Sequence, residues 1–174
     1  MASFASSYIP TTDATATRAA DVASITGSNF SSWYRQDEGT VFADAVGVSI
    51  ISGATRRYLE ISDGTISERT FLGYSSTSNG RFFITDNGTT QADINVISTF
   101  SPKMAAGYVA NGIQMAANGV LGTEDTSANL PTVNRLILGS QDSSTANTFL
   151  NGTIRRLTYW PARLPNETLQ NITQ

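Results

Sequence analysis

Residues 81–96 read Arg-Phe-Phe-Ile-Thr-Asp-Asn-Gly-Thr-Thr-Gln-Ala-Asp-Ile-Asn-Val, which is the pattern of a β-hairpin. Asn87-Gly88 lies at its centre, and both residue types tolerate the positive φ angles that a tight type I′ turn demands. The flanking runs are rich in aromatic, aliphatic and β-branched residues. The same dipeptide recurs at Asn79-Gly80, Asn111-Gly112, Asn118-Gly119 and Asn151-Gly152. The sequence therefore predicts an antiparallel β-protein.

Runs of strand composition continue along the chain, separated by turn residues at intervals of about ten residues, as in an antiparallel sandwich. One short helix is predicted at the C-terminus, capped by Asn166, with Leu169 and Ile172 on one face. Residues 1–17 are rich in Ser, Thr and Ala, and we expect an extended arm that Tyr8 anchors to the body. No linker divides the chain, so residues 1–174 are predicted to form one domain. The predicted strands cover residues 21–25, 39–44, 46–51, 56–61, 69–74, 81–85, 92–98, 104–110, 112–116, 120–122, 135–139 and 149–159.

The composition limits the functions open to this chain. Hydrophobic residues make up 40% and charged residues only 14%, so the surface is mostly neutral and hydrogen-bonding. Such a surface suits a sugar ligand or an extracellular assembly better than nucleic acid, which requires clustered positive charge. No stretch approaches the ~20 apolar residues of a membrane span. The first residues lack the basic and apolar regions of a signal peptide, and whether the chain is a domain cut from a longer protein stays open.

Cysteine and histidine are both absent. Their absence excludes disulfides and thiolate chemistry, and it removes the usual general base at neutral pH and the commonest metal ligand. Asp44, Asp125 and Asp142 are candidates for calcium by residue type alone, because Ca²⁺ takes oxygen ligands. No loop groups several carboxylates, so we predict no cofactor and keep Ca²⁺ as an open alternative.

Motifs near both ends of the chain carry a family resemblance. The motifs are Ser6-Ser7-Tyr8-Ile9-Pro10-Thr11, Thr17-Arg18-Ala19-Ala20-Asp21-Val22, Phe30-Ser31-Ser32-Trp33-Tyr34, Glu38-Gly39-Thr40-Val41-Phe42, Leu150-Asn151-Gly152-Thr153-Ile154, Leu157-Thr158-Tyr159-Trp160-Pro161-Ala162-Arg163-Leu164 and Thr168-Leu169-Gln170. With these motifs the chain resembles the concanavalin A-like, laminin G-like jelly-roll domains of phage and prophage tail proteins, which are similar to carbohydrate-binding modules. The resemblance extends over essentially the whole chain, although its middle matches only by strand pattern.

The resemblance implies two stacked antiparallel sheets, one of them concave, that bind glycans on the concave face or on loops at its rim. Phage use such domains to attach to host-surface polysaccharide, often within trimeric tail assemblies. The implied location is the virion tail or the extracellular space, and a homotrimer or another homo-oligomer is the implied assembly. Trp33 and Trp160 belong to the terminal motifs, so we expect them to be structural rather than sugar-stacking.

Catalysis is not predicted. Glucanases of this fold carry Glu-x-Asp-x-Glu or Glu-x-Asp-x-x-Glu along one strand, and neither pattern occurs here. Glu60 and Asp63 are three residues apart, so on a strand they face opposite sides. Glu124 and Asp125 are adjacent on a predicted loop. Glycoside hydrolysis needs two carboxyls placed across the scissile bond, and distant acids could still meet in space.

A ligand-binding face is predicted on the middle strands. In residues 56–61, Leu59 and Ile61 point to one side of the strand while Tyr58 and Glu60 point to the other. If Leu59 and Ile61 belong to the core, the opposite face of the strand offers ring stacking and directional hydrogen bonds to a polar ligand. The alternative is that this face is an ordinary sheet face exposed to solvent. The predicted concave-face site consists of Tyr58, Glu60, Arg81, Asp93 and Asn95.

The sequence is compatible with two functions. The first is a non-catalytic, lectin-like domain that binds a host-surface or environmental polysaccharide or oligosaccharide as part of a phage tail receptor-binding protein. The second is a structural or oligomerisation domain of a virion fibre without glycan affinity. Nucleic acid and membrane are not predicted partners.

Overall fold

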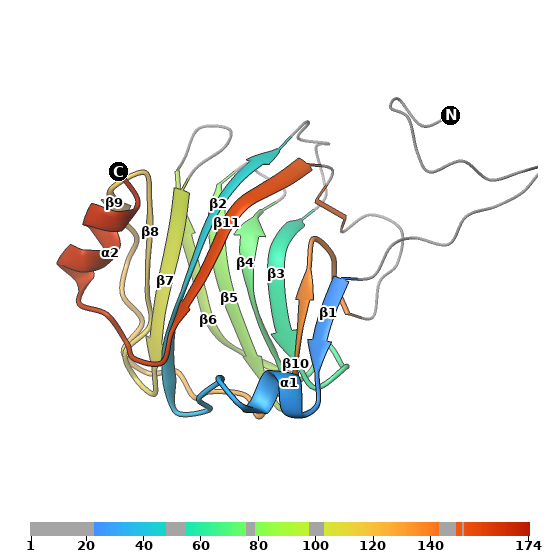
Figure 1. Cartoon of the computed structure of the whole chain (residues 1–174). Helices are drawn as coiled ribbons and strands as arrows, with labels where there is room; N and C mark the ends of the chain where they lie inside the picture. Colours follow the sequence, from blue (N-terminus) through green and yellow to red (C-terminus); the bar gives the residue numbers. More distant parts are fainter. Residues whose placement is uncertain (1–22, 48–54, 76–78, 98–102, 143–148, 151) are drawn as a thin grey trace, which may run out of the picture.

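The computed structural model describes residues 23–47, 55–75, 79–97, 103–142, 149–150 and 152–174. Its strands form two antiparallel sheets stacked face to face (Figure 1). The six-stranded sheet runs, in spatial order, through β1 (Ala23–Thr26), β10 (Arg135–Leu138), β3 (Arg56–Ser62), β4 (Arg69–Tyr74), β5 (Gly80–Asp86) and β6 (Thr89–Val96). The five-stranded sheet runs through β11 (Gly152–Trp160), β2 (Glu38–Gly47), β7 (Lys103–Val109), β8 (Gln114–Ala117) and β9 (Val120–Leu121).

Two short helices complete the described part of the chain, α1 (Ser28–Ser31) and α2 (Asn166–Ile172). The all-β, two-sheet antiparallel sandwich with a short C-terminal helix is therefore confirmed. Helix α1 contains the buried Phe30 and was not predicted. Neither helix is long and apolar enough to cross a membrane. The arm predicted for residues 1–17 lies outside the described residues.

The main core lies between the sheets, because alternate residues of each strand point inward. Val41, Ala43 and Ala45 of β2 contribute one side, and strands such as β4 and β5 contribute Leu72 and Phe82 on the other. All five side chains are 5% exposed or less. Burial at about 25 cal/mol per Å² of apolar surface makes this layer the principal stabilising element.

The Asn-Gly signals form the expected turn at two of the five positions. Asn87-Gly88 joins β5 to β6 with φ angles of 50° and 73°, and Asn118-Gly119 joins β8 to β9 with 48° and 77°. Positive φ at both residues is the mark of a type I′ turn. Asn111 has φ of 61° without a positive φ at Gly112, Gly80 lies within β5, and Asn151 lies outside the described residues.

Strand β2 is a single ten-residue element where the sequence predicts two. It pairs with β11, and the register shift falls between Ile154 and Arg156 of β11, not within β2. A bulge inserts its extra residue into one strand only. Strand β2 therefore continues through the expected break at Ala45, and residues 48–51 lie outside the described part.

Helix α2 packs on the outer face of the five-stranded sheet. Leu169 is fully buried in a small cluster with Phe42, Ala105 and Ala116, against which Trp160 also packs. Figure 1 shows this helix beside β7, β8 and β9.

The predicted cap of this helix is wrong, because Pro165 holds the N-cap position without a side-chain cap bond. Asn166 instead accepts a hydrogen bond from Arg163 at 2.6 Å through Oδ1. The structural role expected for Trp160 agrees with its place in the α2 cluster. That of Trp33 agrees with its packing against Phe30 and Tyr159 at centroid distances of 5.1 and 5.0 Å.

Candidate functional site

The face of the six-stranded sheet that points away from the core, called here the outer face, carries a continuous row of side chains. Strand register places Ile137 of β10 opposite Glu60 of β3, Glu60 opposite Phe71 of β4, Phe71 opposite Phe83 of β5, and Phe83 opposite Asp93 of β6. Residues directly opposite one another in antiparallel strands lie on the same face. The row therefore crosses five strands in line.

A second row runs beside the first. It places Arg57 opposite Gly73, Gly73 opposite Arg81 and Arg81 opposite Asn95. A third row, on the other side of the first, contains Arg135, Ser62, Arg69 and Thr85. Arginine thus recurs on four neighbouring strands of one face. Four of the five predicted site residues, Glu60, Arg81, Asp93 and Asn95, occupy these rows.

Tyr58 does not share this face, so its predicted position is wrong. The register of β3 against β4 shifts between Arg57 and Leu59, which marks a β-bulge. A bulge interrupts the strict alternation of faces on which the prediction depended. Tyr58 joins the inter-sheet core, is 0% exposed and meets Tyr74 edge to face at a centroid distance of 5.6 Å. The backbone approach at this point requires glycine, because a Cβ on Gly73 would lie 2.0 Å from a backbone oxygen.

Glu60 lies on the predicted face but is fully buried there. Its Oε2 lies 2.9 Å from Nε of Arg57, in ion-pair contact without an aligned hydrogen bond, and its Oε1 accepts a hydrogen bond of 3.0 Å from the amide of Asp142. Burial raises the pKa of Glu60 above its ordinary value, although Arg57 opposes the shift. Gln141 accepts a further bond from Arg57. Glu60 therefore holds Arg57 and the segment after β10 in place and does not reach solvent.

Aromatic rings and guanidinium groups alternate across the face. Phe71 and Phe83 stack at a centroid distance of 5.3 Å and an angle of 28°. Arg57 lies over Phe71 at 4.5 Å, and Arg81 lies over Phe83 at 4.6 Å. Arg69 approaches Phe83 from the neighbouring strand at 5.8 Å. Such cation–π contacts are worth on the order of 0.5–2 kcal/mol and orient the arginines.

The part of the face over β5 and β6 is open to solvent. Arg81 and Asp93 form a two-pronged pair, with both N–O distances 2.7 Å and side-chain exposures of 22% and 39%. The amide of Asn95 donates to Oδ1 of Asp93 at 2.9 Å. Phe83 is half-buried beside them. The structure thus brings three predicted residues, Arg81, Asp93 and Asn95, together beside Phe83.

Arg69 has unused hydrogen-bonding capacity and, unlike Arg57 and Arg81, forms no ion pair among the described residues. Its Nε is buried and has no hydrogen-bond partner in the described part of the chain. Burial lowers the pKa of Arg69, and Arg81 adds to the effect, while Glu60 opposes it. An arginine so far from its titration range stays charged at neutral pH. A buried polar atom without a partner favours a ligand that can supply an acceptor.

The sequence prediction missed Arg57, Arg69, Phe71 and Phe83. The signal was present in residues 69–73, where Arg69, Phe71 and Gly73 alternate with the apolar-side residues Thr70 and Leu72. Arginine and aromatic residues alternate on one side of this strand, and a second strand repeats the pattern at positions 81 and 83. Such a pattern on neighbouring strands indicates a sheet face with its own side-chain interactions.

The calcium candidates do not converge. Asp142 bonds to Ser62 at 2.6 Å and lies 3.7 Å from Arg135, and Asp125 accepts from the amide of its neighbour Ser127. Asp44 lies on β2, in the other sheet. Among the residues that the structure describes, no three His, Cys, Asp or Glu side chains are grouped to hold a metal ion.

Comparison with known proteins identifies solved structures that share the fold of this chain. No family model and no curated protein sequence matches the chain. The CBM40 module of the Ruminococcus gnavus IT-sialidase, solved with α2,3-sialyllactose, is similar at a TM-score of 0.65 and 18% identity, covering 80% of this chain and 84% of that one. A heptameric SAP-like pentraxin from Limulus polyphemus is similar at 0.59 and 9% identity, covering 79% and 70%.

Whole sialidases contain the same fold as a part. The leech intramolecular trans-sialidase matches at a TM-score of 0.64 and 16% identity, over 79% of this chain and 23% of that one. At these identities the likeness establishes the jelly-roll sandwich fold of this chain and no more.

Proposed function

We propose that this chain is a non-catalytic carbohydrate-binding domain and that the outer face of the six-stranded sheet holds the glycan. The observation that carries the proposal is the half-buried Phe83, surrounded by the solvent-accessible Arg81, Asp93 and Asn95. An aromatic surface with a few fixed polar groups beside it is the usual composition of a site for a polar organic ligand. The fold likeness to the Ruminococcus gnavus CBM40 module, solved with both α2,3- and α2,6-sialyllactose, supports the same proposal.

The charges of the face favour an acidic sugar. Arg57 and Arg81 are each neutralised by a carboxylate, but Arg69 has an unpartnered Nε next to Phe83. A guanidinium group recognises a carboxylate or a similar oxyanion through paired hydrogen bonds. The preferred ligand is therefore a polysaccharide or oligosaccharide that contains uronic, sialic or otherwise acidic units.

The biological setting rests on the motifs at the chain ends. They support a receptor-binding domain of a phage tail that attaches to a host-surface or environmental polysaccharide, located on the virion tail or outside the cell. A homotrimer is the assembly that such a setting favours. The alternative is a fibre domain that only oligomerises.

A glycan array of neutral and acidic bacterial surface polysaccharides, read with the full chain, tests the proposal. The informative variants are Phe83→Ala and Arg69→Gln. Arg156→Ala is a matched control, because Arg156 lies over Phe42 at 5.6 Å on the outer face of the opposite sheet. We expect Phe83→Ala to weaken binding at least about tenfold, equivalent to about 1.4 kcal/mol. Arg69→Gln should remove the preference for acidic glycans and the dependence on salt, while Arg156→Ala leaves binding unchanged.

Two outcomes would count against the proposal. Equal losses for Phe83→Ala and Arg156→Ala would move the site away from the outer face. No binding across the array, together with a stable oligomer in solution, would favour the fibre-assembly alternative.

A further inference from the structure

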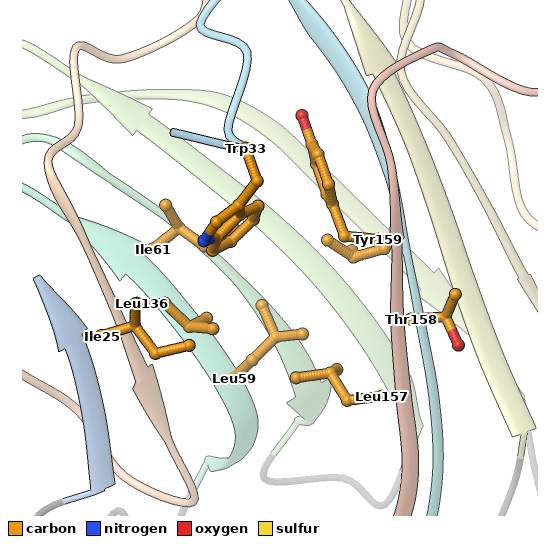
Figure 2. A pocket seen from close by; sticks show the side chains of 9 residues that line it. Ile25, Trp33, Leu59, Ile61, Leu136, Leu157, Thr158 and Tyr159 are labelled. Atoms are coloured by element: carbon orange, nitrogen blue, oxygen red, sulfur yellow. The ribbon is translucent and has the colours of Figure 1, made fainter. Parts of the chain in front are cut away.

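An apolar cavity of about 180 Å³ opens between the two sheets, on the side where β1 and β11 are the edge strands (Figure 2). Its floor includes Leu59 and Ile61, which belong to the main core. Its mouth is formed by side chains that are only half-buried, namely Ile25, Trp33, Leu157 and Tyr159.

The volume suits one large side chain. A dry cavity of about 150 Å³ lined by Leu, Ile and Phe is large enough for benzene. Covering the mouth would also bury the four apolar side chains around it, at about 25 cal/mol per Å². The cavity is therefore shaped for an apolar or aromatic side chain that the described residues do not supply.

The chain itself provides a candidate occupant. Residues 1–22 precede β1, whose Ile25 lines the cavity mouth. Within them, Tyr8-Ile9-Pro10 is a compact apolar cluster in a stretch otherwise rich in Ser, Thr and Ala. The 12 residues between Pro10 and Ala23 span up to about 40 Å when extended, so the distance to the cavity imposes no restriction. Pro10 fixes its own φ and biases Ile9 toward an extended conformation, which suits a segment lying between two strand edges.

We propose that the Tyr8–Pro10 segment of the same chain closes this side of the sandwich, with the ring of Tyr8 in the cavity between β1 and β11. The segment then joins the two sheets at their open edge. Its contribution is to stability, and it is separate from the outer face.

Thermal unfolding of the full chain gives the first test. Tyr8→Ala should lower the Tm by about 5 °C, from the loss of one buried aromatic side chain. Thr12→Ala, in the same arm, should leave the Tm unchanged. In a Trp160→Phe background, Trp33 reports on the cavity mouth. Tyr8→Ala should then shift its emission to the red and increase its quenching by acrylamide.

Cross-linking gives the second test, and the chain contains no cysteine to interfere. Tyr8→Cys paired with Leu157→Cys should form an intrachain link with a short bifunctional thiol reagent. Tyr8→Cys paired with Arg156→Cys should not, because Arg156 lies over Phe42 on the outer face of the five-stranded sheet, away from the cavity. The proposal is overturned if Tyr8→Ala behaves like Thr12→Ala in both Tm and Trp33 emission. Links that form only between two chains would overturn it as well, because they assign the cavity to a neighbouring copy.

Discussion

Nε of Arg57 lies 2.9 Å from Oε2 of Glu60, and the two side chains are only 4% and 0% exposed. The pair lies on the outer face of the sheet, yet the segment after β10 removes it from water. Burial lowers the pKa of Arg57 to about 10 and raises that of Glu60, so the loss of hydration outweighs the mutual attraction in both partners. A buried pair of this kind positions neighbouring groups more than it stabilises the fold. Here it fixes Arg57 over Phe71.

The raised pKa of Glu60 predicts a specific pH dependence of stability. Below the pKa of the unfolded chain, near 4.5, Glu60 is protonated in both states and its contribution to the unfolding free energy is fully present. As pH rises through the folded-state pKa, ionisation favours the unfolded state and that contribution is lost. We expect the wild-type unfolding free energy, relative to Glu60→Gln, to fall over this range by about 1.4 kcal/mol for each pH unit that separates the two pKa values.

Urea unfolding of both proteins at pH values from 4 to 8 measures this difference. Glu167→Gln, on the exposed surface of α2, serves as the control and should show no such slope. A difference between wild type and Glu60→Gln that stays constant with pH would contradict the assignment of Glu60 as a buried acid with a raised pKa.

The strand pattern of this chain was readable from its sequence because it follows local rules. Strand β4 has the predicted bounds, β5 is one residue longer than predicted at each end, and β10 is one residue shorter at its C-terminal end. Alternation of faces and Asn-Gly turn chemistry are properties of short segments, so residues 81–96 specify a hairpin without help from the rest of the chain. The outer-face positions of Arg81, Asp93 and Asn95 follow from the same alternation.

The sequence predictions are wrong where long-range contacts determine the position of a residue. The bulge at Tyr58 depends on how β3 meets Gly73 of the neighbouring strand, and nothing within residues 56–61 reveals it. The burial of Glu60 depends on Asp142, which is 82 residues away in sequence. Asn166 fails as a cap because Arg163 occupies its side-chain oxygen. Each misplaced residue is thus fixed by a tertiary partner that overrides the local preference.

Substitutions at Tyr58 separate a core role from the ligand contact that the sequence pattern favours. Tyr58→Ala should lower the free energy of unfolding by about 3–5 kcal/mol, as for a large side chain removed from a packed core. Tyr58→Phe keeps the ring and should change stability by about 1 kcal/mol or less. Because Tyr58 faces away from the outer face, glycan binding by Tyr58→Phe should equal that of the wild type. A selective loss of binding in a fully folded Tyr58→Phe protein would restore Tyr58 to the site.

Substitutions at Gly73 and Gly88 should lower the stability of the protein by different amounts, in an order opposite to that suggested by the backbone φ angle alone. Gly88 has φ of 73°, but a Cβ there would meet only Oγ of Ser67 at 3.7 Å. Gly73 does not have a positive φ, yet a Cβ on it would lie 2.0 Å from the backbone oxygen of Arg56. We expect Gly88→Ala to cost about 1 kcal/mol through strain and Gly73→Ala several times more, because the backbone at the bulge must move. Chemical unfolding of the two variants decides the order, and similar costs would show that the bulge adapts easily.

The packing of α2 gives a final prediction. Leu169 is 0% exposed in the cluster with Phe42 and Ala116, so Leu169→Ala should destabilise the protein by about 2–5 kcal/mol. Trp160 packs against the same cluster and should report a looser environment through red-shifted emission. Asn171→Ala, on the exposed side of the same helix, is the matched control and should alter neither quantity. If Leu169→Ala costs less than about 1 kcal/mol, the helix contributes little to the sandwich. The five-stranded sheet would then be stable without a cover on its outer face, and that face would become a second candidate surface for a partner.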